Sequence, residues 1–539
     1  MKLATALVLP LILIVLSCAT ITTPAGGPED ELPPVLVKSS PDSGQRNFKG
    51  RNIELTFNEM LQLNNPKEEI IITPPVGKKT DFKLKDNRVI IEPEFELREN
   101  TTYTVTFREG IKDITEGNVA IDPHLAFSTG PDFDSLYLEG TVKYALSEKI
   151  PENVTVAIYA TDTFDIMQHS PEYFAKTDTA GNFRLTHLKA GTYRIYAFLD
   201  KNKNLKLDSQ SELFGFSSQP IILKTHVKKI ALALVRVDTR PFKFNSVRTM
   251  SDVNTIRLNK PAATFSIDIS PRITATYGTD HSEILAYYPD IHPDQPVDST
   301  KIHFTAVDSV EQRIDTSFYI KRDTRPKLEE TFRTSTIEPK FVHETGQFEF
   351  TTSFNKPIHS FLADSLYIES DTATFIPLVG ANIKIDTMNN RLTYSQKLSL
   401  TDSLISPSLR VGKGFLISID GDSSKAESPG IEVISLESTA TLLVEIQTKR
   451  PNYIVQVVDA NDEVVATSVN TPKTSFKYLE PKTYRVRVII DTNANGTWDT
   501  ANYLQNREPE PVVYYRNSDK KTEIPLRANW EVGPNVIKL

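Results

Sequence analysis

Cysteine is almost absent from this sequence: Cys18 is the only one in 539 residues. Thiol catalysis and zinc sites built from thiolates are therefore excluded for the rest of the chain. The sequence also lacks any block of five or six basic residues, and its net charge of -8 is mild for this length. These two features argue against a nucleic-acid-binding surface.

Catalytic motifs are missing as well. The sequence contains no Gly-x-Ser-x-Gly elbow, no Gly-x-Gly-x-x-Gly loop and no phosphate-binding loop. Its nine histidines are scattered along the chain. The sequence therefore predicts a protein that is not an enzyme, although a carboxylate pair assembled only by the fold leaves no sequence signal.

Long apolar runs are confined to the N-terminus. Lys2 precedes an apolar run from Leu3 to Leu16, which is short for a membrane span but typical of an export signal. The run ends in Val15-Leu16-Ser17-Cys18, which resembles the lipobox of bacterial lipoproteins. The resemblance implies that residues 1–17 are a signal peptide and that Cys18 carries the acyl chains, such as palmitate, that anchor the protein. A single cysteine is also unusual for an exported protein unless it is modified.

The remaining composition is typical of β-rich modules. The chain is long enough for several domains, has 34 prolines, and places Val, Ile, Thr, Tyr and Phe in short runs. Residues 18–34, rich in Pro, Gly and Thr, are predicted to form a tether after the lipidated cysteine. We therefore expect an all-β protein made of tandem β-sandwich domains.

The first domain is predicted over residues 35–130. Ile53–Phe57 and Tyr103–Phe107 alternate between apolar and polar residues, as strands of a sandwich do. Several short motifs, among them Phe57-Asn58-Glu59 and the closing Phe127-Ser128-Thr129-Gly130, resemble the bacterial Ig-like domain common in lipoproteins of the Bacteroidota. The resemblance implies a fold but no chemistry.

A duplication defines two further domains. Thr192-Tyr193-Arg194 and Thr483-Tyr484-Arg485 each lead through an apolar run into a loop rich in Asp and Asn. Residues 134–236, with the turn and strand Thr177–Leu185, resemble the transthyretin-like or carboxypeptidase-regulatory-like sandwich, and residues 438–539 repeat this plan.

Between the two copies we predict two more Ig-like sandwiches, over residues 240–336 and 337–437. Leu258-Asn259-Lys260-Pro261 and Phe354-Asn355-Lys356-Pro357 echo the Phe-Asn-Glu motif of the first domain. The five domains are then expected to follow one another as a rod hung from Cys18.

The two Asp/Asn loops are candidate calcium sites, because their side-chain oxygens fall at positions 1, 3, 5 and 9 of an EF-hand-like loop. The predicted ligands are Asp200, Asn202, Asn204 and Asp208 in the first loop and Asp491, Asn493, Asn495 and Asp499 in the second. The match is partial, since Glu212 comes one position late in the first loop, and in the second Asn502 occupies position 12 and no nearby carboxylate closes the site. The alternative is an Asx-rich turn braced by hydrogen bonds from side chain to backbone.

Taken together, these features favour an outer-membrane lipoprotein that acts as a binding or scaffolding subunit of an outer-membrane or cell-surface assembly. Its expected partners are the membrane, through the lipid, and other outer-membrane or surface proteins. Surface exposure is favoured over the periplasmic face. One alternative is an accessory protein that binds glycans, for which only Trp498 and Trp530 offer indole platforms. Another is a hydrolase with an unrecognised site near Tyr287, Tyr288 and His292.

Overall fold

The computed structural model describes residues 30–539 apart from 78, 122–124, 161–163, 203, 208–211, 251–252, 269–272, 288–298, 322–330, 370–374 and 400–406. The described residues confirm the predicted all-β fold of tandem β-sandwiches. We refer to domains 1 to 5 by their strands, β1–β9, β10–β17, β18–β24, β25–β34 and β35–β42, each set with its own apolar core. None of the helices in the described ranges is long and apolar enough to cross a membrane.

Domain 1 is a sandwich of the four-stranded sheet β1-β2-β6-β5 and the three-stranded sheet β4-β7-β9, with β3 and β8 paired separately. Buried and half-buried positions alternate along Ile53–Phe57, because every second side chain of a strand points into the core. The elements are β1 (Leu36–Ser40), β2 (Ile53–Phe57), β3 (Leu61–Leu63), α2 (Pro66–Glu69), β4 (Ile71–Thr73), β5 (Asp81–Lys85), β6 (Arg88–Glu92), β7 (Thr102–Thr106), β8 (Ile111–Asp113) and β9 (Leu125–Ser128).

Domain 2 contains a strand that is buried on both faces. The second strand of the domain places Val156 in the domain's own core and Tyr159 in a separate apolar cluster that includes Val310 and Ala501 of later domains. The elements are β10 (Leu136–Tyr144), β11 (Thr155–Tyr159), β12 (Tyr173–Lys176), β13 (Asn182–Leu188), β14 (Gly191–Phe198), β15 (Leu213–Phe216), β16 (Ile221–Leu223) and β17 (Val227–Arg236). Its first strand, β10, pairs in parallel with β17 and antiparallel with β13.

Domain 5 repeats the topology of domain 2. Its first strand, β35, pairs in parallel with β42 and antiparallel with β38, as β10 does with β17 and β13. The elements are β35 (Ala440–Gln447), β36 (Ile454–Val458), β37 (Val464–Val469), β38 (Lys473–Leu479), β39 (Thr483–Ile489), β40 (Val512–Tyr514), β41 (Ile524–Pro525) and β42 (Glu531–Lys538). In both domains the tyrosine of the duplicated tripeptide donates its hydroxyl to the carbonyl oxygen four residues earlier, Tyr193 to Lys189 at 2.8 Å and Tyr484 to Glu480 at 3.0 Å.

Domain 3 packs the sheet β18-β19-β22-β21 against β20-β23-β24. Its strands are β18 (Phe244–Met250), β19 (Val253–Leu258), β20 (Thr264–Asp268), β21 (Thr274–Tyr277), β22 (Glu283–Tyr287), β23 (Ser299–Val307) and β24 (Arg313–Lys321). Domain 4 combines the sheet β30-β31-β26-β25-β34 with the smaller sheets β27-β33 and β29-β28-β32. Its elements are β25 (Lys340–Val342), β26 (Gln347–Ser353), β27 (Ile358–Phe361), η1 (Ala363–Ser365), β28 (Leu366–Glu369), β29 (Phe375–Pro377), η2 (Gly380–Asn382), β30 (Ile383–Asp386), β31 (Arg391–Lys397), β32 (Ser408–Val411), β33 (Leu416–Ser418) and β34 (Glu432–Ile434).

The asparagine of the repeated sequence motif has the same role in domains 1, 3 and 4. In each domain its side-chain oxygen accepts a hydrogen bond from a backbone N–H near the start of the domain. The pairs are Asn58 with Val35 at 2.7 Å, Asn259 with Lys243 at 2.8 Å and Asn355 with Arg333 at 2.8 Å. The echoes in the sequence therefore mark equivalent positions in three sandwiches.

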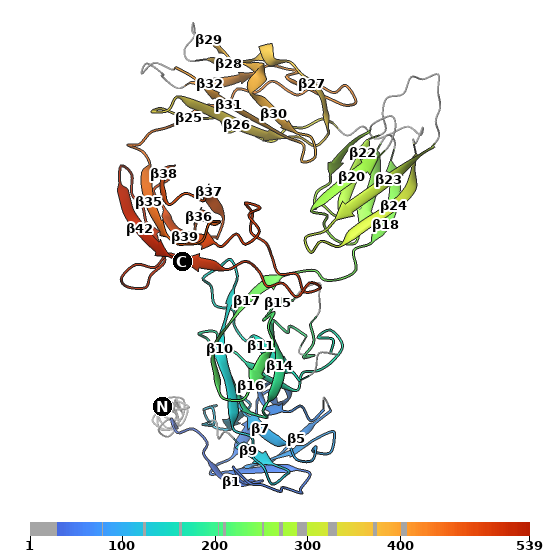
Figure 1. Cartoon of the computed structure of the whole chain (residues 1–539), viewed down its shortest axis with the longest axis vertical. Coiled ribbons are helices and arrows are strands. Elements are labelled where there is room, and N and C mark those ends of the chain that lie inside the picture. Colours follow the sequence, from blue (N-terminus) through green and yellow to red (C-terminus); the bar gives the residue numbers. More distant parts are fainter. Residues whose placement is uncertain are drawn as a thin grey trace, which may run out of the picture.

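The domains do not form the linear rod that their order suggested. Figure 1 shows domains 1 and 4 at opposite ends of the long axis, with domains 2, 3 and 5 between them. Domain 5 folds back onto domain 2, because domain 2 has an apolar outer surface that side chains of domains 3 and 5 help to bury. The expectation of a rod is therefore wrong, and residues more than 300 positions apart are in contact.

Candidate functional site

The first Asp/Asn loop follows β14 and is braced by its own side chains. The Asp200 carboxylate accepts hydrogen bonds from the backbone N–H groups of Asn204 and Leu205, at 3.0 and 2.9 Å. Asn202 accepts a further bond from the Asn204 N–H at 3.2 Å. Asp208, the fourth predicted ligand, lies outside the described residues.

The second loop follows β39 and has nearly the same hydrogen bonds. Asp491 accepts the N–H groups of Asn495 and Gly496 at 3.1 and 2.9 Å. The side-chain amides of Asn493 and Asn495 donate to the Asp499 carboxylate, the latter at 3.1 Å to each oxygen. The structure therefore brings all four predicted residues of this loop together.

Glu510 closes the second loop, which corrects the expectation that no carboxylate does so. Glu510 is buried, and its carboxylate accepts the N–H groups of Thr492 at 2.6 Å and Asp499 at 3.1 Å. Buried Glu212 has the same position in the first loop, where it accepts the Lys201 N–H at 3.2 Å. Glu510 was missed because the distance along the chain between loop and glutamate differs between the two copies.

The oxygens of both loops are used as acceptors for N–H groups. No group of three or more His, Cys, Asp or Glu side chains in the described ranges is arranged to hold a metal ion. Amide and carboxylate oxygens of this kind also suit a hard cation such as calcium. Calcium binding by these loops therefore stays a prediction, beside the alternative of a braced turn.

Residues 501–508, which we call the docking segment, follow the second loop and join domain 5 to domain 2. The ring of Tyr503 lies between 6.1 and 6.3 Å from the rings of Tyr196, Phe214 and Phe216 in domain 2. Burial raises the pKa of the Tyr503 hydroxyl. Trp498, just before the segment, is partly buried against the same cluster. An aromatic cluster of this kind adds directional packing to the burial of apolar area.

The same segment also binds domain 3. The side-chain amide of Asn502 donates to the backbone oxygen of Val310 at 2.8 Å, and both groups are buried. Gln505 and Arg507 donate to the Glu311 carboxylate, each at 2.9 Å. These hydrogen bonds, with that of Gln505 the larger cause, hold the pKa of Glu311 below its usual value. A single loop therefore ties three domains together.

A buried ion pair shapes the turn of domain 3 that receives this segment. Lys260 pairs with Asp308, and their side chains are only 3% and 1% exposed. Asp308 also accepts the N–H groups of Val310 and Gln312 at 2.9 and 2.8 Å. The lysine of the repeated sequence motif therefore fixes the turn that presents Val310 and Glu311 to domain 5.

A second contact zone joins domain 5 to residues 146–147 of domain 2. The carbonyl oxygen of Leu146 in domain 2 accepts hydrogen bonds from Arg487 at 2.8 Å and from the Tyr514 hydroxyl at 2.9 Å. The neighbouring Ser147 donates to Asp462 at 2.8 Å. The two zones together fix the orientation of domain 5 as well as its position.

A cleft of about 1020 Å³ lies between domains 1 and 2. Strands β4, β5 and β12, which contribute to its walls, each stand at the edge of a sheet. Ile72, Phe82 and Phe174 supply apolar lining from these strands, and charged side chains of both signs surround them. The cleft also reaches Asp200, so the first Asp/Asn loop borders it.

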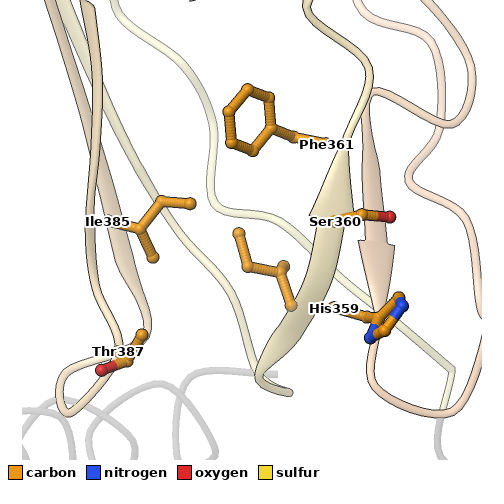
Figure 2. A pocket seen from close by; sticks show the side chains of 6 residues that line it. His359, Ser360, Phe361, Ile385 and Thr387 are labelled. Atoms are coloured by element: carbon orange, nitrogen blue, oxygen red, sulfur yellow. The ribbon is translucent and has the colours of Figure 1, made fainter. Parts of the chain in front are cut away.

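A smaller pocket, of about 380 Å³, lies in domain 4. Figure 2 shows Phe361 and Ile385 projecting into the space between β27 and β30, whereas Ser360 points away from it. Its remaining polar lining is His359 and Thr387. This set contains no carboxylate to orient the histidine and no nucleophile directed at it, so it forms no triad.

Besides Asp208, the signal peptide predicted over residues 1–17 and the tether residues 19–29, two predicted features lie outside the described residues. Cys18, the predicted lipidation site, is one of them. The other is the Tyr288 and His292 pair, where a hydrolase site was considered. Tyr287 is described, and it is a buried residue of β22.

Comparison with protein families gives two matches. Residues 30–129 match a bacterial Ig-like domain, in agreement with the first-domain prediction. Residues 151–240 match a family described as an uncharacterized protein conserved in bacteria, DUF2141, rather than the transthyretin-like or carboxypeptidase-regulatory-like family that the sequence resembles. No curated protein matches the sequence significantly.

Solved structures with a similar fold include bacterial surface proteins. The S-layer protein rSbsC is 12% identical, with a TM-score of 0.15 over 92% of this chain and 68% of that one. BcpA, the major pilin subunit of Bacillus cereus, is 11% identical, with a TM-score of 0.13 over 76% and 98%. Dimeric latent PorU from Porphyromonas gingivalis is 9% identical, with a TM-score of 0.24 over 50% and 34%. Similarities this low concern the β-sandwich fold alone.

Proposed function

We propose that the protein is a non-catalytic binding and scaffolding subunit of an outer-membrane or cell-surface assembly, anchored to the outer membrane by a lipid on Cys18. The docking segment is the observation that carries this proposal. It fastens domain 5 to domains 2 and 3 through a buried hydrogen bond and an aromatic cluster. Surfaces far apart in the sequence are thereby held in one arrangement, as a scaffold requires.

The cleft between domains 1 and 2 is the candidate binding site for a protein partner. Its bordering edge strands, β4, β5 and β12, lie at the ends of their sheets. An edge strand can accept an extended peptide as one more strand, with apolar pockets giving specificity. The chemistry of this cleft therefore favours an extended segment of a partner protein that carries apolar side chains.

Glycan binding is the second candidate function, and a single side chain favours it. Trp530 is 50% exposed, and the Arg527 guanidinium lies 5.0 Å from the centre of its ring. Trp498 is less suited to a sugar platform, because it is partly buried and its indole N–H donates to the Glu510 carbonyl oxygen at 3.1 Å. One exposed indole makes a small platform, so the protein-binding function is preferred.

The test is cross-linking in intact cells, followed by purification of the full-length lipoprotein from solubilised membranes. We expect a stoichiometric outer-membrane or surface protein to co-purify with the wild type. The partner should be lost or strongly reduced in an Asn502→Ala/Tyr503→Ala variant and retained in Leu504→Ala, whose side chain is 60% exposed within the same segment. Recovery of glycan alone would favour the second function, and recovery of no partner would contradict the proposal.

Surface exposure is part of the same proposal and has its own measurement. Proteinase added to intact cells should degrade the protein if it faces outwards. Complete protection, with degradation only after the outer membrane is opened, would place it on the periplasmic face.

A further inference from the structure

Domain 1 carries an exposed aliphatic surface at the point where the chain enters it. We call this surface the entry patch. Its members are Leu32, Val35, Val37, Met60, Ile114 and Ile121, which are 73, 48, 67, 57, 59 and 62% exposed. Single exposed apolar residues need no explanation, but a cluster of this kind marks a contact with a protein or a membrane.

The patch residues come from three short segments, residues 32–37, 58–60 and 114–121, which backbone and side-chain contacts hold side by side. The Val35 N–H donates to the side chain of Asn58 at 2.7 Å, and the Asn58 N–H donates back to the Val35 carbonyl oxygen at 3.1 Å. The Ile121 N–H lies 3.4 Å from the carbonyl oxygen of Pro34. The pairing of β3 with β8, continued by one residue, sets Met60 opposite Ile114.

We propose that the entry patch rests on the surface of the lipid bilayer and orients the protein there, an inference that relies on the lipid anchor of the proposed function. Eleven residues, 19–29, separate Cys18 from the first described residue, Asp30. Fully extended, this length of chain spans at most about 40 Å. The patch therefore stays close to the membrane whenever Cys18 is acylated, and a bilayer is the apolar phase within its reach.

The patch is purely aliphatic, so its contact with a bilayer would be driven by apolar burial. It contains only Leu, Val, Met and Ile, whereas the energetic centres of protein interfaces are enriched in Trp, Tyr and Arg. Aliphatic side chains of this kind bury readily at the boundary between headgroups and acyl chains. Binding driven by apolar burial should also resist added salt, unlike attraction between charges.

Carboxylates beside the patch define which lipid surface it fits. Glu59 lies close enough to Asp30 and Asp113 that both help to raise its pKa, after burial as the larger cause. Negative charge at this edge opposes an anionic membrane. The patch therefore suits a zwitterionic surface such as phosphatidylcholine or phosphatidylethanolamine.

The experiment measures sedimentation of the chain from residue 18 onward, carrying Cys18→Ser, with phosphatidylcholine vesicles. This chain cannot be acylated, so its binding reports the patch alone. We expect binding that persists in 0.5 M salt and is weaker on vesicles rich in phosphatidylglycerol. The double variant Leu32→Ser/Ile121→Ser should bind at least about tenfold less. The matched control Ile222→Ser/Met250→Ser changes two exposed apolar residues of domains 2 and 3 and should bind as the parent does.

Two results would overturn the proposal: no binding of the parent chain to vesicles, or equal binding by the parent and the Leu32→Ser/Ile121→Ser variant. Equal melting temperatures of the three proteins would show that the substitutions leave the fold intact. Failure of the anchor would be seen separately, as absence of labelled palmitate on the wild-type protein grown with that fatty acid.

Discussion

The side-chain amide of Asn502 donates a hydrogen bond to the carbonyl oxygen of Val310, 192 positions earlier in the chain, at 2.8 Å. Both residues are buried, so neither group can exchange this bond for one with water. A buried polar contact between domains is directional, and it specifies one arrangement where apolar contact alone would permit several. Domain 5 is therefore positioned on domain 3 as well as on domain 2.

Removal of this anchor should release domain 5. Asn502→Ala leaves the Val310 oxygen without its donor, which costs about 1–3 kcal/mol of the docking free energy. Tyr503→Ala removes the ring that packs on three aromatic side chains of domain 2. We expect the double variant to have a larger radius of gyration in small-angle X-ray scattering. Leu504→Ala should scatter like the wild type, and equal scattering by all three proteins would contradict this role for the segment.

Acid should weaken the same junction. Hydrogen bonds from Gln505 and Arg507 lower the pKa of Glu311 below its usual value of 4.5. The ionised carboxylate therefore contributes stability that is fully present above pH 4.5 and is lost as the pH falls through the lowered pKa. The difference in melting temperature between wild type and Glu311→Gln should be constant near neutral pH and shrink below pH 4.5. A difference that grows in acid would contradict this assignment.

The buried lysine of domain 3 gives a third prediction. Lys260→Met leaves the Asp308 carboxylate buried without its cation, which costs about 3–5 kcal/mol. The double variant Lys260→Met/Asp308→Leu removes both charges and should regain part of this stability, as measured by urea unfolding. Faster cleavage of the docking segment by an added protease in both variants would show that the turn of residues 308–312 keeps domain 5 docked.

The second Asp/Asn loop is tested through its first carboxylate, Asp491. Asp491→Ala removes the acceptor of two backbone N–H groups and should lower the melting temperature with calcium or with chelator present. If the loop also binds calcium, millimolar calcium will stabilise the wild type further, and Asp491→Ala will abolish the share of this increment that the second loop contributes. A wild-type melting curve indifferent to calcium would reject the metal interpretation.

The proposed lipid anchor depends on a single residue, Cys18. Cys18→Ala removes the site of acylation, so we expect the protein to leave the membrane fraction after washing with high salt. Salt-resistant retention equal to that of the wild type would show that acylation is not the main anchor. A smaller fraction retained through the entry patch should disappear when Leu32→Ser/Ile121→Ser is added.

The architecture of each sandwich was predictable because its signals are local. Alternation along Ile53–Phe57 and the repeated Asn motif each describe a few neighbouring residues, and both have a direct structural counterpart. The signal of the Thr-Tyr-Arg duplication is also local, because the Tyr193 hydroxyl donates to the carbonyl oxygen of Lys189, only four residues earlier. Glu510 was not predictable, because its contacts with Thr492 and Asp499 depend on how the chain returns after the loop.

The sequence of β14 contains an indication that another domain covers domain 2. Ile195-Tyr196-Ala197-Phe198 in β14 is apolar at every position, where a strand with one solvated face would alternate. Ile195 faces the core of domain 2, and Tyr196 and Phe198 face the cluster covered by domain 5. A sandwich strand that is apolar on both faces indicates that something covers its outer face. The strand's own sequence does not show which domain provides this cover, because that depends on the fold of the whole chain.

The return of domain 5 also has a consequence for the order of events during biogenesis. Domain 3 touches domain 4 through the Tyr277 N–H and the Met388 carbonyl oxygen, 2.8 Å apart, so domains 2 to 5 form a closed circuit. The C-terminal residues are synthesised after domain 2, and closing so long a loop carries an entropic cost. Until then the aromatic face of domain 2 stays open to solvent. The newly made chain therefore passes through a half-assembled state in which this aromatic face is a defined surface for a chaperone to shield.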